Sequence, residues 1–241
     1  LFFRAQDVAA GVPQDEMSRA AADGRAVNER WHVRKDGSRF WGSGLTMPLA
    51  GDEGGFVKIF RDRTAEHEAE AALRESEARL RFSRELEKAL FDATGATQAM
   101  EAAAGMLGRK LAVSRCAYAD VDLDRDRFWI RNDYTAPGVA SSAGLYSLEL
   151  FGPRAFADMQ EGRTLIVRSV EAELQPGEGR EMFQSIGIEA IICCPLVKDG
   201  RLTAMMAVHQ DNARDWTQAE IALVQEVVER CWAHVQRVGA E

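Results

Sequence analysis

Hydrophobic and polar side chains alternate in the first part of the chain. Between Val27 and Arg34, the odd positions hold Val, Glu, Trp and Val, and the even positions hold only polar residues. This period of two is typical of a half-buried strand. Asp36 and Gly37 follow, and both tolerate the positive φ angles that hairpin turns need. With further strands at residues 39–48 and 56–61, separated by the glycine-rich residues 51–55, the pattern predicts a three-stranded antiparallel sheet.

Residues 64–92 form one long segment of a different kind. The segment contains neither Gly nor Pro, and Ala, Glu, Arg and Leu dominate it, which predicts a single helix. Glu70 and Arg74 are four residues apart, in the favourable order for an ion pair. Leu73 and Leu80 are seven apart and belong to a weak apolar seam like that of a parallel coiled coil. The seam fits either a solvated connector or a signalling helix that shifts between two packings, and the sequence leaves both open.

The remainder of the chain predicts a second domain of mixed helices and strands. The expected helices cover residues 97–111, 153–160, 178–186 and 217–238. The expected strands cover residues 116–121, 127–134, 145–150, 164–167, 190–197 and 201–209. The last two strands form a hairpin about Lys198-Asp199-Gly200, and Thr217 with Glu220 has the spacing of a capping box. The fold class predicted for the whole chain is therefore α+β.

Length, charge and cysteine usage restrict the classes of function. The chain has 241 residues and a net charge of −8, which argues against a nucleic-acid partner or an anchor on an anionic membrane. No apolar run reaches the roughly 18–20 residues needed to cross a bilayer, and no signal peptide is visible. Four cysteines without C-x-x-C spacing favour a cytoplasmic location with reduced thiols. Because the chain does not begin with Met, we expect it to be part of a longer protein.

The first sheet carries a recognisable motif. The stretch from Trp31 to Gly37, W-x-x-R-K-D-G, and the later Asp62-Arg63-Thr64 resemble the C-terminal half of a PAS domain, the PAC motif. The resemblance implies a sensory domain whose five-stranded antiparallel sheet is represented by its last three strands. It also implies that Asp62 and Thr64 tie the last strand to the exit helix and act in signal relay. The other part of the fold would form much of a PAS ligand pocket, so no PAS ligand site is carried over.

The end of the chain carries a second resemblance. The sequences C-P-L-V-K-D-G-R-L-T-A-M-M-A-V-H and W-T-Q-A-E-I-A-L-V-Q-E-V-V-E-R-C-W are similar to those of GAF domains, most closely in bacterial sensor histidine kinases of the HWE type. The resemblance implies a cytoplasmic segment of a two-component system, with the kinase core beyond Glu241. The expected domains are the C-terminal part of a PAS domain (1–64), a signalling linker helix (65–92) and a complete GAF domain (86–241). The GAF fold implies an antiparallel sheet with helices on both faces.

The sequence shows no catalytic constellation. It has no P-loop, no G-x-S-x-G elbow and no glycine-rich ATP site of a kinase. His67-Glu68 looks like the His-Glu pair of a phosphoacceptor, but it falls in the exit helix, where we expect plain solvent exposure. Cys231 and His234 are three residues apart on one helix, yet two ligands do not make a metal site. We therefore predict no catalytic residue, no metal site and no identifiable cofactor.

Several specialised GAF functions lack their motifs in this chain. Bilin-binding GAF domains carry a D-I-P type motif or a Cys-His pair, and cyclic-nucleotide-binding ones carry N-K-x-x-x-F-x-x-x-D-E; the sequence has none of these. Redox sensing would need a cysteine of low pKa beside a cation or a helix N-terminus, and the sequence shows none. An activity similar to that of free methionine sulfoxide reductases would need clustered reactive cysteines near a polar pocket. Cys193 and Cys194 are neighbours in a strand, so their side chains are expected on opposite faces.

A ligand pocket is expected on the sheet face that the long helices leave free. Its candidate residues come from a central strand, from the segment that covers the sheet, and from the hairpin. They are Tyr118, Asp120, Phe151, Phe156, Met159, Phe183, Cys193 and Met205. The same aromatic and Met side chains would serve equally well to fill the domain core, and the sequence leaves that alternative open.

The sequence thus predicts a module for signal input and relay. A small ligand or a partner would favour one packing of the GAF domain, and the helices would carry a shift along a parallel homodimer to a C-terminal kinase output domain. The apolar stripes expected on those helices are Leu73, Leu80, Ile221, Val224, Val228 and Trp232. The alternative is a passive dimerisation module without a small ligand. Neither a nucleic acid nor a membrane is expected as a partner.

Overall fold

The computed structural model describes residues 3–50, 54–122, 124 and 126–238. The chain divides into two compact units, Leu1–Arg81 and Phe82–Glu241, and each is described by itself. Most of the reversal expected at residues 51–55 lies outside the described residues, as do Leu123 and Arg125. None of the helices in the described ranges is long and apolar enough to cross a membrane.

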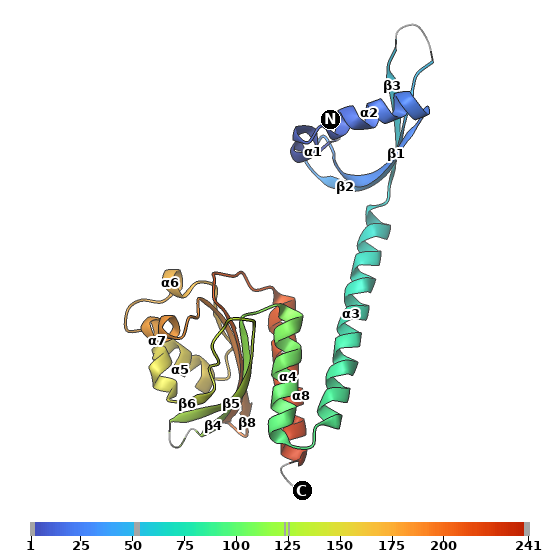
Figure 1. Ribbon diagram of the computed structural model, residues 1–241. Coiled ribbons are helices and arrows are strands. Elements are labelled where there is room, and N and C mark those ends of the chain that lie inside the picture. Colours follow the sequence, from blue (N-terminus) through green and yellow to red (C-terminus); the bar gives the residue numbers. More distant parts are fainter. Residues whose placement is uncertain (1–2, 51–53, 123, 125, 239–241) are drawn as a thin grey trace. The chain divides into compact units, whose positions relative to one another are not determined.

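The first unit is built on the predicted three-stranded antiparallel sheet (Figure 1). Its strands are β1 (Ala26–Val33), β2 (Arg39–Pro48) and β3 (Phe56–Asp62), with β2 in the centre. The turn between β1 and β2 places Gly37 at a φ of 84°, which a residue without a Cβ adopts at no steric cost. The local turn signal in the sequence therefore identified the hairpin correctly.

Two helices, α1 (Ala5–Ala9) and α2 (Val12–Asp23), accompany this sheet. The buried residues of β1 are the even ones, including Asn28 and His32, whereas Val27 keeps 62% of its surface exposed. The apolar members of the alternating pattern therefore do not mark the buried face of this strand.

A buried carboxylate accounts for that polar face. Glu16 of α2 is 1% exposed, and its Oε1 atom lies 2.5 Å from the Lys58 ammonium and accepts a 2.9 Å hydrogen bond from the Asn28 amide. Thr46 donates a further hydrogen bond to the same oxygen. Because a buried charge must be paired and hydrogen-bonded, the strands present polar side chains where α2 brings Glu16.

The predicted long helix is present as α3 (Thr64–Asp92). Arg74 and Glu70 form the expected ion pair on its surface, at 3.0 Å. Glycine is common as a left-handed residue just after a helix, but Gly95 does not cap α3 in that way. Gly95 is extended, with a φ of −175°, and it is the N-cap of the following helix, α4 (Ala96–Leu111).

The second unit contains a six-stranded antiparallel sheet. Its strand order is β6-β5-β4-β9-β8-β7. The bounds are β4 (Arg115–Asp122), β5 (Arg127–Thr135), β6 (Gly144–Tyr146), β7 (Leu165–Val167), β8 (Ala190–Lys198) and β9 (Arg201–Gln210). Asp199 and Gly200 form the tight β8–β9 turn, both with positive φ angles, as the sequence predicts.

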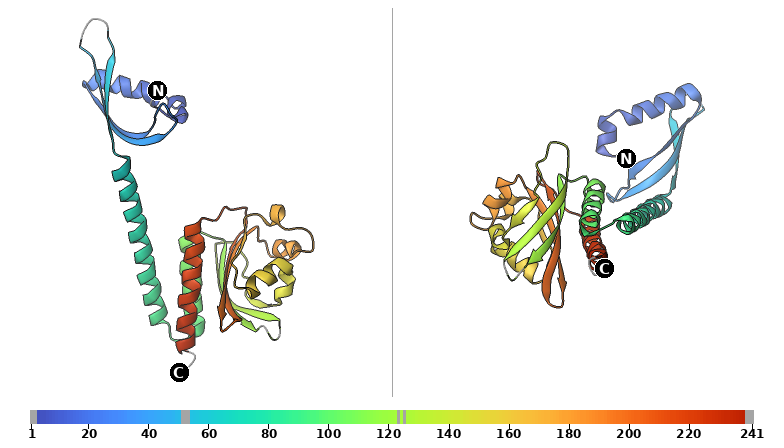
Figure 2. Two further views of the ribbon diagram at one scale, coloured as in Figure 1. Left: turned by 180° about the vertical axis from the view of Figure 1, so that it is seen from behind. Right: turned by 60° about the horizontal axis from the view of Figure 1, so that its bottom comes forward.

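Helices pack on one face of this sheet to form a large apolar core. α4 and α8 (Gln218–Val238) run side by side along the face, as Figures 1 and 2 show. Phe82, Leu86 and Leu90, from the last part of α3, belong to the same core. The C-terminal part of α3 is therefore an integral piece of the second unit.

Shorter segments pack on the opposite face of the sheet. They are η2 (Leu148–Phe151), α5 (Gly152–Gln160), α6 (Val170–Glu173) and α7 (Arg180–Ser185). The sequence-based strand at 145–150 is thus only partly correct, because the chain leaves β6 after Tyr146 and turns into a 3₁₀ helix. α6 was not anticipated. Cys194 lies in the helix-side core and Cys193 in the core beneath α5, so the two faces of β8 were assigned correctly.

The apolar stripe of α8 serves the domain's own core. Ile221, Val224 and Val228 are buried against the sheet and α4, so this part of the stripe expected for a dimer is not available on the surface. Trp232 is partly buried, with the Lys198 ammonium 5.0 Å from its ring centre. The helix begins with the predicted capping box, in which the Glu220 amide donates to the Thr217 hydroxyl at 3.2 Å and the Thr217 amide donates to the Glu220 carboxylate at 2.8 Å.

Candidate functional site

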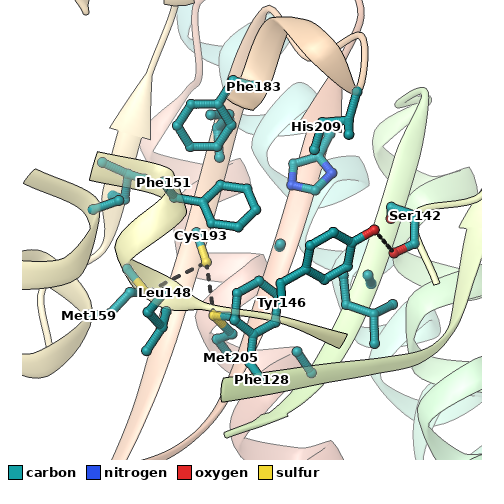
Figure 3. A pocket seen from close by; sticks show the side chains of 18 residues that line it. Phe128, Ser142, Tyr146, Leu148, Phe151, Met159, Phe183, Cys193, Met205 and His209 are labelled. Atoms are coloured by element: carbon teal, nitrogen blue, oxygen red, sulfur yellow. Dashed lines mark hydrogen bonds between the residues drawn. The ribbon is translucent and has the colours of Figure 1, made fainter. Parts of the chain in front are cut away.

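A largely apolar cavity lies between the sheet of the second unit and its covering segments (Figure 3). Its volume is about 50 Å³. The sheet supplies small side chains to the floor, among them Ala117, Ala119 and Ala207. Because these side chains are short, the segments above cannot fill all the space over the sheet centre, and a cavity remains.

Aromatic rings form one wall of the cavity. Phe128 of β5 stacks on Tyr146 of β6 at 5.4 Å between ring centres, and Phe151 of η2 lies 5.6 Å from Phe128. Phe183 of α7 continues the row at 5.2 Å from Phe151. Each ring comes from a different element, so the wall depends on the correct packing of all four.

Two glycines hold the roof segments close together. Gly152 at the start of α5 and Gly179 before α7 have φ angles of 89° and 90°. A Cβ on Gly152 would lie 2.2 Å from the Glu178 carbonyl oxygen, and one on Gly179 would lie 2.0 Å from the Phe151 carbonyl oxygen. Only residues without a side chain permit this approach of two backbones, which places Phe151 and Phe183 over the cavity.

Three sulfur atoms meet where α5 packs on the sheet, one from α5 and two from strands β8 and β9. The Cys193 Sγ atom lies 3.6 Å from the Met159 Sδ atom and 3.7 Å from the Met205 Sδ atom. Burial raises the pKa of the Cys193 thiol far above its usual range, so the thiol stays protonated. Burial likewise raises the pKa of Cys194 and Cys231 to about 12. This chemistry does not provide the thiolate that redox catalysis needs.

One end of the cavity is polar. His209 of β9 is only 7% exposed, and its ring points into the cavity (Figure 3). The Tyr146 hydroxyl donates to the Ser142 carbonyl at 2.9 Å, and the Ser142 hydroxyl donates to Asp133 at 2.7 Å. Burial, together with the nearby positive charge of Arg115, lowers the pKa of His209 to about 3. The imidazole is therefore neutral at physiological pH.

Five of the eight residues predicted for the pocket line this cavity. They are Phe151, Met159, Phe183, Cys193 and Met205. Phe156 packs against the same core without lining the cavity. The assignment of Tyr118 and Asp120 needs correction, because Ala117 and Ala119 face the cavity and the alternation of β4 turns Tyr118 and Asp120 toward the other face.

Sequence reasoning missed several lining residues, including Phe128, Tyr146, Ser142 and His209. A signal for His209 was present. Met205 was placed on the floor, and residues two and four positions further along a strand share its face. Ala207 and His209 follow from Met205 by that rule, and both line the cavity.

The junction between β3 and α3 is held by the two residues predicted for signal relay. The Asp62 carboxylate accepts hydrogen bonds from the Thr64 amide at 3.0 Å and the Thr64 hydroxyl at 2.6 Å. The Thr64 hydroxyl in turn accepts from the Trp41 amide of β2 at 2.9 Å. Hydrogen bonds from the Thr64 side chain and amide hold the pKa of Asp62 below its usual value. The first turn of α3 is thus bonded directly to the central strand.

His67 takes part in the same junction rather than standing free in solvent. Its ring stacks on Trp41 at 4.0 Å between centres with an interplanar angle of 10°, and its edge meets Trp31 at 5.5 Å. The expectation of plain solvent exposure for His67 is therefore wrong. Cys231 and His234, the pair considered as metal ligands, make other contacts. The Cys231 thiol faces the Ala99 carbonyl, and the His234 ring contacts Arg237. Within the described ranges, no group of three or more His, Cys, Asp or Glu side chains is arranged to hold a metal ion.

Comparison with known proteins identifies relatives of the chain. A "Two-component system protein A" from Emericella nidulans is 42% identical over 65 residues, which cover 26% of this chain and 10% of that protein. The chain thus spans about a tenth of the length of this curated relative.

Solved structures with the same fold have low sequence identity. The chromophore-binding domain of the bacteriophytochrome RpBphP3 from R. palustris has a TM-score of 0.61 at 14% identity, covering 96% of this chain and 80% of that one. The GAF domain of an Acinetobacter phosphoenolpyruvate-protein phosphotransferase has a TM-score of 0.53 at 10% identity, covering 68% and 95%. A free methionine-R-sulfoxide reductase from Neisseria meningitidis has a TM-score of 0.51 at 15% identity, covering 64% and 86%. These likenesses establish the fold alone.

The family follows from a match over more than half of the sequence. The GAF domain profile matches residues 96–235, which include α4, every strand of the six-stranded sheet and most of α8. The residues that line the cavity fall inside this range. GAF is a regulatory sensory domain, and no catalytic domain is evident in the part of the chain that the structure describes. The chain belongs to the GAF domain family.

Proposed function

We propose that this chain is the sensory and relay segment of a cytoplasmic two-component histidine kinase of the HWE type. Membership in the GAF family supports the sensory part, and the relative named two-component system protein A supports the signalling system. In this proposal, the first unit is the C-terminal part of a PAS domain, residues 65–92 are the signalling linker helix, the GAF domain covers residues 86–241, and the kinase output domain follows Glu241.

The observation that carries the proposal is the continuity of α3. At one end, Thr64 is hydrogen-bonded to β2 of the first unit. At the other end, Phe82, Leu86 and Leu90 are buried in the helical layer of the GAF domain. A helix fixed by hydrogen bonds at its start and by core packing at its end transmits displacement between the two attachments, because its own backbone is stiff.

The proposed mechanism is a shift between two packings of this helical layer. α3, α4 and α8 share one core, so a change at the GAF sheet alters the surface on which α3 rests. A ligand shifts such an equilibrium only by the difference in its affinity for the two states. A hundredfold difference in affinity corresponds to about 2.7 kcal/mol, enough to reverse a modest preference.

We further propose that the protein works as a parallel homodimer. Leu73 and Leu80 support this part, because they lie seven residues apart on α3 and remain 60% and 54% exposed. Apolar side chains at that spacing are suited to a coiled-coil seam with a second copy. The stripe of α8 is mostly buried inside the domain, so α3 is the helix proposed for the contact.

The test is Asp62→Ala in the full-length kinase, with ligand-dependent or signal-dependent autophosphorylation as the readout. The substitution removes the hydrogen bonds to Thr64 at the start of α3. Asp36→Ala is the matched control, because Asp36 also accepts bonds from a hydroxyl and an amide, but both belong to Ser38 of the β1–β2 turn and not to α3. We expect Asp62→Ala to uncouple regulation and Asp36→Ala to preserve it. Unchanged regulation in Asp62→Ala would sink the relay proposal.

The exposed leucines also favour a second candidate function, passive dimerisation. A passive module would lose its dimer on Leu73→Glu and Leu80→Glu substitution, and the kinase would lose activity with it. Asp62→Ala would then leave both the dimer and its regulation unchanged. Light scattering of the purified chain, together with the autophosphorylation assay, separates the two functions.

A further inference from the structure

In the described ranges of the chain, two buried nitrogen atoms near the polar end of the GAF cavity lack hydrogen-bond partners: the His209 Nδ1 atom, in the cavity lining, and the Arg115 Nε atom, on the neighbouring strand. Arg115 of β4 and His209 of β9 are paired across adjacent antiparallel strands and are only 6% and 7% exposed. The Arg115 guanidinium donates one hydrogen bond, to the Ile186 carbonyl at 2.5 Å. Among the described residues, nothing accepts from the Arg115 Nε atom or pairs with the His209 Nδ1 atom.

Such atoms call for a partner. Leaving a buried polar atom unsatisfied costs about 1–3 kcal/mol, so native proteins satisfy nearly all of them with protein groups, water or a ligand. His209 directs its ring into the cavity, as Figure 3 shows, so a molecule inside the cavity can reach its free nitrogen. The polar end is therefore the natural position for the head of a bound molecule.

The rest of the cavity specifies the body of that molecule. Among the residues that the structure describes, no charged side chain lines it, and the walls are Phe128, Phe151 and Phe183 together with the sulfur-containing side chains. An ionised ligand would lose its hydration, and the described lining offers no charged side chain in direct contact to compensate for that loss. The neutral body of a ligand would instead gain from contact with the aromatic rings.

The volume limits the size. About 50 Å³ is a third of the roughly 150 Å³ of an engineered cavity that holds benzene. Met159 and Met205 have flexible, unbranched side chains that repack readily around a guest. Their movement permits a guest of one six-membered ring, whereas a larger ring system would have to displace the roof held by Gly152 and Gly179.

We infer that the GAF cavity binds a neutral molecule of one ring or smaller, oriented by a single hydroxyl or carbonyl group toward His209. This inference rests on the proposed sensory function and names the ligand class for the same domain. The positive charge of Arg115 beside His209 favours an electronegative atom at that end. The head group distinguishes this class from purely apolar guests, and its lack of charge distinguishes it from organic acids.

The test compares phenol, benzene and benzoate as probes, with binding to the whole chain measured by ligand-observed NMR and calorimetry. Phenol and benzene have the same ring and differ in one hydroxyl group. We expect phenol to bind about fivefold more tightly than benzene, the factor that one net hydrogen bond supplies. Benzoate should not bind measurably.

Two variants locate the effect. His209→Leu removes the proposed partner of the hydroxyl group, so phenol and benzene should then bind equally. Ala207→Leu fills the cavity beside His209, so both probes should lose binding while the imidazole remains. Circular dichroism of each variant verifies the fold, and a variant that fails to fold is replaced by His209→Phe or Ala119→Leu.

Equal binding of phenol and benzene to the unmodified chain would overturn the role of His209. Absence of binding by both, or tighter binding of benzoate, would overturn the ligand class. Neither result bears on relay, because the relay test measures autophosphorylation of Asp62→Ala in the full-length kinase. Loss of relay with intact phenol binding would remove the proposed function and leave the cavity assignment in place.

Discussion

The attachment of α3 to the GAF domain can be measured with a matched pair of leucines. Leu86 is 1% exposed in the core shared by α3, α4 and α8, whereas Leu80, six residues earlier in the same helix, is 54% exposed. Replacing each by Ala removes the same atoms from the same helix. The two variants therefore differ only in the surroundings of the deleted side chain.

The expected magnitude follows from burial. Leu→Ala removes buried carbon atoms worth about 0.8 kcal/mol each and leaves a cavity, so a buried site loses about 2–5 kcal/mol. We expect Leu86→Ala to lower the free energy of unfolding of the second unit by about 3 kcal/mol, since Leu86 is almost wholly enclosed. For a domain of this size, that loss lowers the melting temperature by about 6–12 °C. Leu80→Ala should stay within about 0.5 kcal/mol.

The assay is chemical denaturation followed by circular dichroism, at several protein concentrations. Concentration matters because a dimer through Leu80 would make the stability of the parent chain rise with concentration, and Leu80→Ala would abolish that rise. Equal losses in the two variants would contradict the docking of α3 that the structure shows. If Leu86→Ala lowered the free energy of unfolding only slightly, the reasoning that α3 acts through its packing in the GAF core would be refuted.

Three further outcomes are expected. Gly152→Ala should lower the melting temperature strongly, because its Cβ would lie 2.2 Å from a backbone carbonyl oxygen. The control is Gly138→Ala, which is also at positive φ but has open space around it and should cost only about 1 kcal/mol of backbone strain. Similar losses of stability in the two variants would contradict the close approach of the two backbones at Gly152. Burial alone would raise the pKa of Glu220, but hydrogen bonds from Thr217 and the Arg214 cation lower it below the ordinary value. The stabilisation from the Glu220 carboxylate is therefore present above its unfolded pKa and is lost as the pH falls through its folded pKa. Glu220→Gln should flatten the acid side of the plot of stability against pH, and an unchanged plot would contradict the capping role. All four cysteines are buried, so a thiol reagent should modify none in the native chain and all four in denaturant; rapid reaction of the native chain would show that the GAF core opens.

Local signals in the sequence predicted the local elements well. The bounds of α3 follow from a run of helix formers, and the β8–β9 turn follows from Asp199 and Gly200, whose backbone angles suit a tight hairpin. These features depend on residues near one another in the chain, so the sequence alone contains the information.

The faces of strands were harder to predict, because they depend on distant partners. In β1 the buried side chains are polar, since α2 brings the Glu16 carboxylate over the sheet. In β4 the small Ala117 and Ala119 face the cavity and the large Tyr118 faces the helices. A period of two identifies a strand but does not say which parity meets a helix and which meets a cavity.

A stripe of apolar residues is ambiguous for the same reason. Ile221, Val224 and Val228 have the spacing of a helix face that needs a partner, and the partner is the domain's own sheet. Leu73 and Leu80 have a similar spacing and stay exposed. The spacing in the sequence indicates that these side chains need a packing partner. Only the tertiary structure shows whether that partner belongs to the same chain.

The adjacency of Cys193 and Cys194 in β8 has an evolutionary consequence. One side chain faces the cavity and the other faces the core that holds α3, although a single peptide bond joins them. A substitution that enlarges either side chain displaces the same stretch of backbone, so the fitness effect of a change at one position depends on the residue at the other. At this one position of the cavity lining, an enlarged side chain therefore needs a compensating change on the helix side of the same strand.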